Sequence, residues 1–175
     1  SPMSRGLGDV YKRQHLLFLA ALCLPFSARQ WKPLLWLITC FTIGHSLSLI
    51  LASLEVLEVS STWIEFLIPV SIAATAVYNM IYAQRVWVRS NRLVMWVTLF
   101  FGLVHGFGFA GYFELIRDVD QPLWSSLLFF AFGIEGAQIV LGTLMLLLSF
   151  VVLIVLDRNR RDWILVVSSV IIGIL

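Results

Sequence analysis

Four long apolar stretches limit what this chain can fold into. They cover residues 33–57, 62–83, 93–113 and 123–156, and shorter apolar stretches flank them at residues 15–26 and 163–175. About 20 consecutive apolar residues are enough for a helix to cross a bilayer. Because the bilayer interior offers no hydrogen-bond partners to the backbone, such stretches cross it as helices. The pattern predicts an all-α, polytopic transmembrane bundle of about six helices, of which the first and the last are truncated.

The composition excludes other classes of protein. Hydrophobic residues make up 60% of the chain and charged residues 13%, whereas soluble domains carry about 25% charged residues. So little charge cannot cover the surface of a soluble domain, and so much apolar surface is not left disordered. Both cysteines, Cys23 and Cys40, lie in apolar stretches, which excludes a disulfide framework and a Cys-rich zinc site. We find no glycine-rich nucleotide loop and no basic patch for nucleic acid.

The first fourteen residues do not match the rest of the chain. Residues 1–14 are polar, with no apolar periodicity and no signal-peptide pattern. They resemble a translated cloning scar, and we expect a non-native or disordered tail, with a native mobile tail as the alternative. Residues 15–175 then form a single transmembrane domain. Its fifth stretch is long for one straight span, so we expect a tilt, a break near Gly133 and Gly136, or an interfacial turn after Pro122.

The charges of the connecting segments alternate along the chain. The basic residues of the first, third and fifth segments are Arg29, Lys32, Arg85, Arg89, Arg92, Arg158, Arg160 and Arg161. The second segment carries Glu55 and Glu58, and the fourth is mainly acidic. Basic connections stay on the cytoplasmic side. The alternation therefore places the start of the first helix on the outer side of the membrane.

Five ionisable residues lie within the apolar stretches. They are His15, His45, His105, Glu65 and Glu135. Such groups are costly in a bilayer and are functional by default. A rise of 1.5 Å per residue places all three histidines about 18–20 Å from the inner face, near the midplane. Glu135 reaches the same layer, and Glu65 lies nearer the outer surface.

Helical spacing places small or polar residues beside each ionisable group. Thr42 and Ser48 share a face with His45, Gln138 shares a face with Glu135, and Asn79 shares a face with Glu65. Small residues line the contacts between membrane helices, so these faces are expected to point into the bundle. The four polar residues are supporting candidates. Interhelical hydrogen bonding explains Asn79 and Gln138 equally well, and packing explains the other two.

Imidazole and carboxylate groups together suit Ni²⁺, Co²⁺, Zn²⁺ or Cu²⁺, and they can also relay protons. We therefore expect a reversible site for a transported divalent metal, with no permanently bound cofactor. Other interpretations stay open. Two histidines could ligate the haem of an electron carrier, a metallohydrolase could use a metal-bound water, and an accessory protein would transport nothing. No His-Glu-x-x-His motif is present, and a homo-oligomer stays open.

Several segments resemble motifs of the HupE/UreJ family of bacterial membrane proteins. FTIGHSLSL at residues 41–49 resembles the family's FTxxHSxTL helix, and HGFGFAG at residues 105–111 resembles HGxGFAG. FGIEGAQ at residues 132–138 resembles FNxGVExGQ, with Gly133 in place of asparagine. Glu65 with residues 71–79 resembles VExxIAxSI…N, and HLLF at residues 15–18 resembles the end of GxDHxLF, whose glycine and aspartate this chain lacks.

The resemblance implies a secondary permease for nickel or cobalt in the bacterial inner membrane. It implies that His15, His45, His105 and Glu135 line the metal pathway, together with Glu65. It also implies an outer N-terminus, which agrees with the charge alternation. The partners expected of such a chain are the lipid bilayer and a divalent metal ion, and we expect no enzymatic activity.

Overall fold

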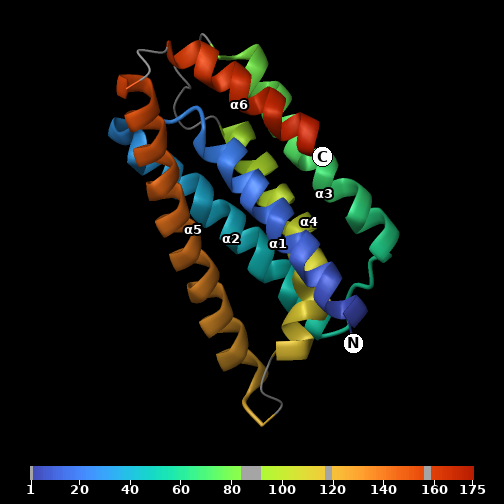
Figure 1. The fold of residues 1–175 in the computed structure, drawn as a ribbon. Helices are drawn as coiled ribbons and strands as arrows, with labels where there is room; N and C mark the ends of the chain where they lie inside the picture. Colours follow the sequence, from blue (N-terminus) through green and yellow to red (C-terminus); the bar gives the residue numbers. More distant parts are fainter. Residues whose placement is uncertain (1, 84–91, 117–119, 156–158) are drawn as a thin grey trace.

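The chain folds into a bundle of six helices (Figure 1). The computed structural model describes residues 2–83, 92–116, 120–155 and 159–175. The helices are α1 (Pro2–Cys23), α2 (Trp31–Ser53), α3 (Ser61–Ile81), α4 (Arg92–Ile116), α5 (Leu123–Val155) and α6 (Arg160–Ile174), with a short 3-10 helix η1 (Ala28–Gln30) before α2. This part of the chain contains no strand. The predicted all-α class and the number of helices are confirmed.

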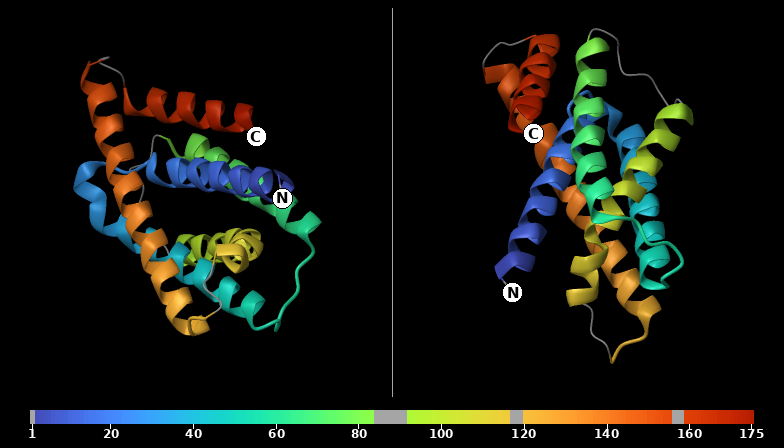
Figure 2. Two further views of the ribbon diagram at one scale, coloured as in Figure 1. Left: turned by 60° about the horizontal axis from the view of Figure 1, so that its bottom comes forward. Right: turned by 90° about the vertical axis from the view of Figure 1, so that its right-hand side faces the viewer.

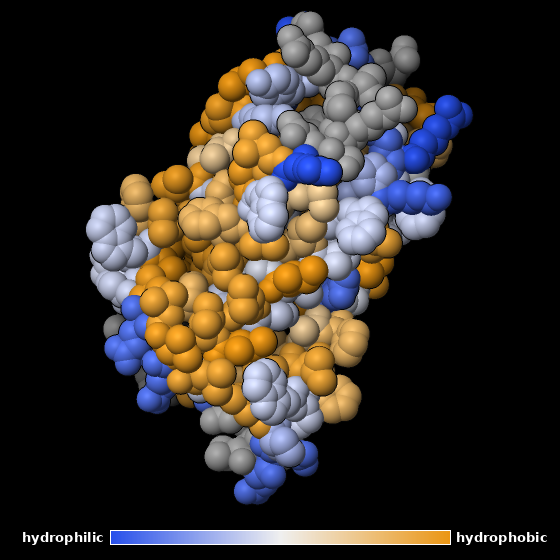
Figure 3. Space-filling view, turned by 180° about the vertical axis from the view of Figure 1, so that it is seen from behind, coloured by the Kyte–Doolittle hydropathy of each residue, from blue (hydrophilic) through white to orange (hydrophobic). Residues whose placement is uncertain are grey.

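The surface of the bundle is that of a membrane protein. Helices α2 to α5 are long and apolar enough to cross a membrane. Large apolar side chains such as Phe129 and Phe132 are exposed on the outside of the bundle. Figure 3 shows hydrophobic residues over the middle of one face, with hydrophilic residues mostly towards its two ends. This belt is the surface that a bilayer covers.

Helix α1 begins earlier than the sequence predicts. We expected a helix from residue 15 to residue 26, and the structure has one from Pro2 to Cys23. Proline is well tolerated in the first turn of a helix because its missing N–H has no partner there. At the other end, Pro25 cannot continue the hydrogen-bond ladder, and the helix stops two residues before it. Residues 2–14 are thus helical and not a disordered tail, while their foreign origin stays a prediction.

Helix α2 ends at Ser53 and not at the predicted residue 57. The backbone turns at Glu55, whose φ is 55°. The Val56 N–H donates to the Leu51 carbonyl, and the Glu55 N–H donates to the Ala52 carbonyl, both at 3.0 Å. These two bonds form a Schellman motif, which closes the last turn of a helix. Glycine is the usual residue at the left-handed position, so a glutamate there gave no stop signal in the sequence.

Helix α5 is one unbroken helix of 33 residues. Of the three alternatives considered for it, a break near Gly133 and Gly136 is wrong, because both residues lie within continuous helix. At 1.5 Å per residue the helix is about 50 Å long. It therefore exceeds the roughly 30 Å of a bilayer core and either tilts or extends beyond it. Figure 2 shows α5 crossing the bundle obliquely along one side.

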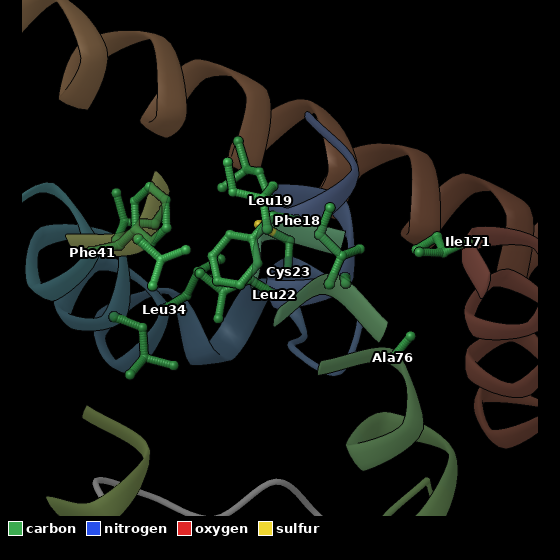
Figure 4. Close-up of a cluster of buried hydrophobic side chains, with 14 of the residues drawn as sticks. Phe18, Leu19, Leu22, Cys23, Leu34, Phe41, Ala76 and Ile171 are labelled. Atoms are coloured by element: carbon green, nitrogen blue, oxygen red, sulfur yellow. The ribbon is translucent and has the colours of Figure 1, made fainter. Parts of the chain in front are cut away.

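The main hydrophobic core lies around α1. Phe18, Leu22 and Cys23 of α1 are buried together with Phe41 of α2 and Ile72 of α3. Figure 4 shows side chains of α1 and α2 converging, with Ala76 of α3 and Ile171 of α6 at the edge of the cluster. Helix α1 contacts α3, α4, α5 and α6. The side chains on the inward face of α1, such as Phe18, are therefore held inside the bundle.

Helices α2 and α4 pack through glycines. A Cβ atom on Gly44 would overlap the Leu99 carbonyl oxygen of α4, and one on Gly102 would overlap the Phe41 carbonyl oxygen of α2. A Cβ on Gly106 would overlap the Ser48 hydroxyl. Small residues let the backbones of membrane helices approach closely. This contact fixes α2 against α4 directly beside His45 and His105.

Candidate metal-binding site

The three histidines come from three different helices and meet inside the bundle. The His15 ring centroid lies 5.8 Å from that of His45 and 5.9 Å from that of His105. His45 and His105 are each 1% exposed. Two imidazoles that bind one ion at about 2.1 Å have ring centroids roughly 4.5–6.4 Å apart, depending on the angle at the ion. The observed separations fall in this range.

His105 is held by Ser71 of α3. The Ser71 hydroxyl lies 3.0 Å from His105 Nε2 and donates its hydrogen to the Ile68 carbonyl at 2.7 Å. When the single Ser71 hydrogen points to Ile68, Ser71 accepts from His105 and Nε2 is the ring nitrogen that carries the hydrogen. This leaves Nδ1 of His105 with the lone pair. The contact therefore orients a neutral imidazole that can act as a ligand.

His15 is held by Gln138 of α5. The amide nitrogen of Gln138 lies 3.0 Å from His15 Nε2. The amide oxygen of Gln138 accepts from the Thr42 hydroxyl of α2 at 2.8 Å. These contacts join α1, α2 and α5 through buried polar groups. Buried polar groups that are hydrogen-bonded to one another specify one arrangement of the helices around them.

Two ring nitrogens of the histidine cluster lack a hydrogen-bond partner among the described residues. Nδ1 of His15 and Nε2 of His45 are buried, and neither has a hydrogen-bond partner within the described part of the chain. An unpaired buried polar atom normally costs about 1–3 kcal/mol. A bound cation would satisfy such a nitrogen in the tautomer that gives it a lone pair.

Aromatic rings enclose the cluster. The Phe41 ring lies 5.2 Å from the His15 ring and 5.3 Å from the His105 ring. The Phe109 ring lies 5.6 Å from His15 and 5.4 Å from His45. The void between His15, Phe41 and Gln138 is too narrow to hold a water molecule. The cluster is thus closed to solvent in this conformation.

The site is not a preformed metal cage. No group of three or more His, Cys, Asp or Glu side chains in the described residues is already placed to hold a metal. The hydrogen bonds above explain why, since Nε2 of His15 and Nε2 of His105 both face protein partners. A metal would have to recruit the opposite ring nitrogens. An apolar cavity of about 290 Å³ between α1, α3 and α4 lies elsewhere and includes none of the histidines.

The two glutamates lie in different places. Glu135 is half-buried on α5 and accepts a hydrogen bond from the Thr39 hydroxyl of α2 at 2.9 Å. It is one helical turn from Gln138, which binds His15. Glu65 is exposed on α3 and shares a side-chain hydrogen bond with Tyr11. The structure therefore brings Glu135 close to the histidine cluster and leaves Glu65 at the surface.

Asn79 and Ser48 have structural partners. The Asn79 amide donates to the Ala21 carbonyl at 2.7 Å. That carbonyl has no helical donor, because the residue four positions later is Pro25. Ser48 donates to the His45 carbonyl at 2.8 Å and occupies the space left by Gly106. Both residues hold helices together, while Thr42 and Gln138 touch the site itself.

Sequence reasoning missed several residues around the site. Ser71 was not a candidate, although it lies in a segment that resembles a family motif. Thr39 precedes Thr42 by three residues and so shares its face of α2, which is a signal that could have identified it. The enclosing rings of Phe41 and Phe109 each lie one helical turn from a histidine on their own helix. An aromatic residue in an apolar helix is too common to stand out.

Comparison with known proteins identifies the family. The model of the HupE / UreJ protein family matches residues 10–175, nearly the whole chain. The chain belongs to this family. HupE/UreJ proteins are associated with nickel or cobalt transport or with urease and hydrogenase maturation. The match includes all three histidines of this HupE/UreJ protein.

No curated protein and no solved structure matches the chain at the threshold used.

Proposed function

We propose that this protein is a permease that moves a divalent transition metal such as nickel or cobalt across the membrane. The observation that carries the proposal is the convergence of three imidazole rings from α1, α2 and α4 in the buried interior. Two of these rings have buried nitrogens with no partner among the described residues. Neutral imidazole nitrogens are good ligands for Ni²⁺ and Co²⁺.

The glutamates supply negative charge along the path. A divalent cation among neutral imidazoles keeps its full charge, and a buried charge needs a counter-charge nearby. Glu135 lies on the helix that holds His15 and faces α2. Glu65 is exposed at the first turns of α3 and would attract cations to the entrance. The closed cluster then opens towards one side of the membrane at a time.

The charge alternation of the connecting segments gives the orientation of the proposed permease in the membrane. Basic connections place the turn after α1, the connection after α3 and the connection after α5 in the cytoplasm. Metal would then enter from the outer side of the bacterial inner membrane, where α3 begins. No nucleotide-binding motif is present in the sequence, so a gradient or another subunit would drive the movement.

Uptake into proteoliposomes tests the proposal. Purified protein in vesicles should accumulate Ni²⁺ or Co²⁺ above empty vesicles, and His45→Ala and His105→Ala should each abolish the accumulation. Phe129→Ala is the matched control, since it removes an aromatic ring that is 77% exposed on α5. It should transport like the unaltered chain. All variants should insert and purify in comparable amounts.

Unchanged uptake by both histidine variants would contradict the proposal. Saturable metal binding without any transport would support an accessory role in metal delivery instead.

A further inference from the structure

The Thr42 hydroxyl lies near two hydrogen-bond acceptors but has only one hydrogen to donate. Its hydroxyl lies 2.8 Å from the Gln138 amide oxygen and 3.1 Å from the Ile38 carbonyl oxygen. The first distance is typical of an O–H donor, and the second is slightly longer than the usual range of about 2.5–3.0 Å. Thr42 is 5% exposed and Gln138 is 2% exposed, so water does not supply a second donor. The hydrogen of Thr42 can therefore point to Gln138 or to its own helix.

In the first arrangement the hydrogen bonds run from α2 towards His15. Thr42 donates to the oxygen of Gln138, and the nitrogen of Gln138 donates to Nε2 of His15. A neutral imidazole that accepts at Nε2 carries its hydrogen on Nδ1. Nδ1 is buried, without a partner in the described part of the chain. An N–H group at that position cannot bind a cation.

In the second arrangement the same bonds run the other way. The Gln138 amide turns over by half a rotation, which exchanges its oxygen and nitrogen at unchanged positions. His15 Nε2 then donates to the Gln138 oxygen, the Gln138 nitrogen donates to Thr42, and Thr42 donates to the Ile38 carbonyl. The His15 ring changes tautomer when the site is open to water: water takes the hydrogen from Nδ1 and returns one to Nε2, so the ring stays neutral. Nδ1 now presents a lone pair.

The geometry points to Thr42 and Gln138 as positioning residues that set which nitrogen of His15 is free to bind the metal. The first arrangement closes His15 to a cation, and the second opens it. His45, whose ring centroid is 5.8 Å away, also has a buried unpartnered nitrogen. Binding between the two rings therefore selects the second arrangement. This inference rests on the proposed function and adds a hydrogen-bond reversal to it.

Affinity for Zn²⁺ tests the role of Thr42, because Zn²⁺ is diamagnetic and suits imidazole ligands. Thr42→Val keeps the side-chain shape, but it leaves the Gln138 amide hydrogens of the second arrangement without an acceptor. We expect about a tenfold loss of affinity, as is typical when the partner of a metal-binding histidine is removed. Thr42→Ser retains the hydroxyl and should bind within about twofold of the unaltered chain.

Thr143→Val is the matched control. Thr143 donates to the Ile139 carbonyl four residues earlier at 2.8 Å, as Thr42 can to Ile38. It is exposed on α5, and this hydrogen bond involves no residue of the histidine cluster. Its loss should leave the affinity unchanged. Equal affinities for Thr42→Val and the unaltered chain, or equal losses in Thr42→Ser and Thr42→Val, would overturn the inference.

The position of the hydrogen on His15 is a readout that a structural role would not move. Nitrogen NMR of histidine-labelled protein distinguishes Nδ1–H from Nε2–H, and His15→Gln assigns the signal. Without metal, the unaltered chain should show Nδ1–H, and Zn²⁺ should shift the hydrogen to Nε2. Gln138→Glu in its ionised form offers only acceptors and should hold the hydrogen on Nε2 without metal. A hydrogen on the same nitrogen of His15 in all three samples would overturn the proposed hydrogen-bond reversal.

The two proposals fail separately. If the unaltered chain binds no Zn²⁺ while Gln138→Glu still moves the hydrogen of His15, the result contradicts the proposed function and supports the hydrogen-bond reversal. If Zn²⁺ binds and the hydrogen of His15 never moves, the result contradicts the hydrogen-bond reversal and supports the proposed function.

Discussion

Helices α2 and α5 are both apolar enough to span a membrane, yet they are packed very differently. In the most apolar stretch of α2, 56% of the residues are buried, against 11% in α5. Helix α2 is locked to α4 through Gly44, Gly102 and Gly106. On α5, Gly133 and Gly136 have no neighbouring atom within 4 Å of an added Cβ. The same residue type marks a helix contact in one place and an open surface in the other.

The difference divides the candidate metal-binding site into two halves. His45 and His105 lie on the tightly packed pair α2 and α4. Gln138 and Glu135 lie on α5, which reaches α2 through side-chain hydrogen bonds to Thr42 and Thr39. A transport site has to bind and release its ion. The α2–α4 pair therefore carries two of the proposed ligands on a tightly packed interface, while α5 contributes its polar residues through fewer packing contacts.

The glycine contrast gives the largest expected effect. Gly44→Val should cost about 3 kcal/mol or more, because its side chain would overlap backbone that cannot move aside. The folded, monodisperse yield in detergent should collapse. Gly133→Val is the control and should purify like the unaltered chain, since its site is open. Comparable yields for the two variants would show that α2 and α4 are not locked together as described.

Removing the amide of Asn79 tests how α1 is held on the side of the bundle away from α5. Asn79→Leu leaves the Ala21 carbonyl without a donor, which should lower stability by about 1–3 kcal/mol. Thermal unfolding in detergent measures the loss. Met80→Leu, a similar change at a half-buried neighbour, should have little effect. An unchanged melting temperature for Asn79→Leu would mean that the bond between α3 and α1 contributes nothing.

Loss of the Thr39 hydroxyl should have a smaller effect on stability. Hydrogen bonds between membrane helices contribute about 0.6 kcal/mol on average, so Thr39→Val should melt only slightly earlier than the unaltered chain. Thr39→Val should lower the metal affinity more clearly than it lowers the melting temperature, because Glu135 loses its hydrogen-bond donor. Thr39→Ser should restore the affinity. A stability loss as large as that of Asn79→Leu would show that α5 is held more firmly than its burial indicates.

The smallest effect is expected at the end of α2, where Glu55 holds a left-handed backbone conformation. Glu55→Gly should stabilise the protein by about 0.5 kcal/mol, since glycine adopts this conformation without steric cost. The melting temperature should rise slightly. Glu58→Gly in the same exposed connection is the comparison variant, and we expect no gain from it. A lower melting temperature for Glu55→Gly would contradict the role of the Schellman motif.

The sequence predicted the helices better than it predicted the side-chain contacts between them. Apolar length and spacing identified six helices and placed His15, His45 and His105 in one interior layer, because both depend on helical geometry alone. The ends of α1 and α2 were missed, since glutamate at a left-handed position and a helix through polar residues give no local signal. The pairing of Asn79 with Ala21 depends on Pro25, which lies in the turn after α1 and far from Asn79 in the sequence. Such contacts require the packing of the whole bundle.

The direct test of the central claim is to count the ligands of the bound ion. Purified protein is loaded with Ni²⁺, and X-ray absorption spectroscopy is recorded for the unaltered chain and for His45→Ala/His105→Ala. We predict a nickel ion bound by at least two imidazoles in the unaltered chain, and no stoichiometric binding in the double variant. Nickel bound with the same imidazole signal in the double variant, or no nickel bound to the unaltered chain, would contradict the account.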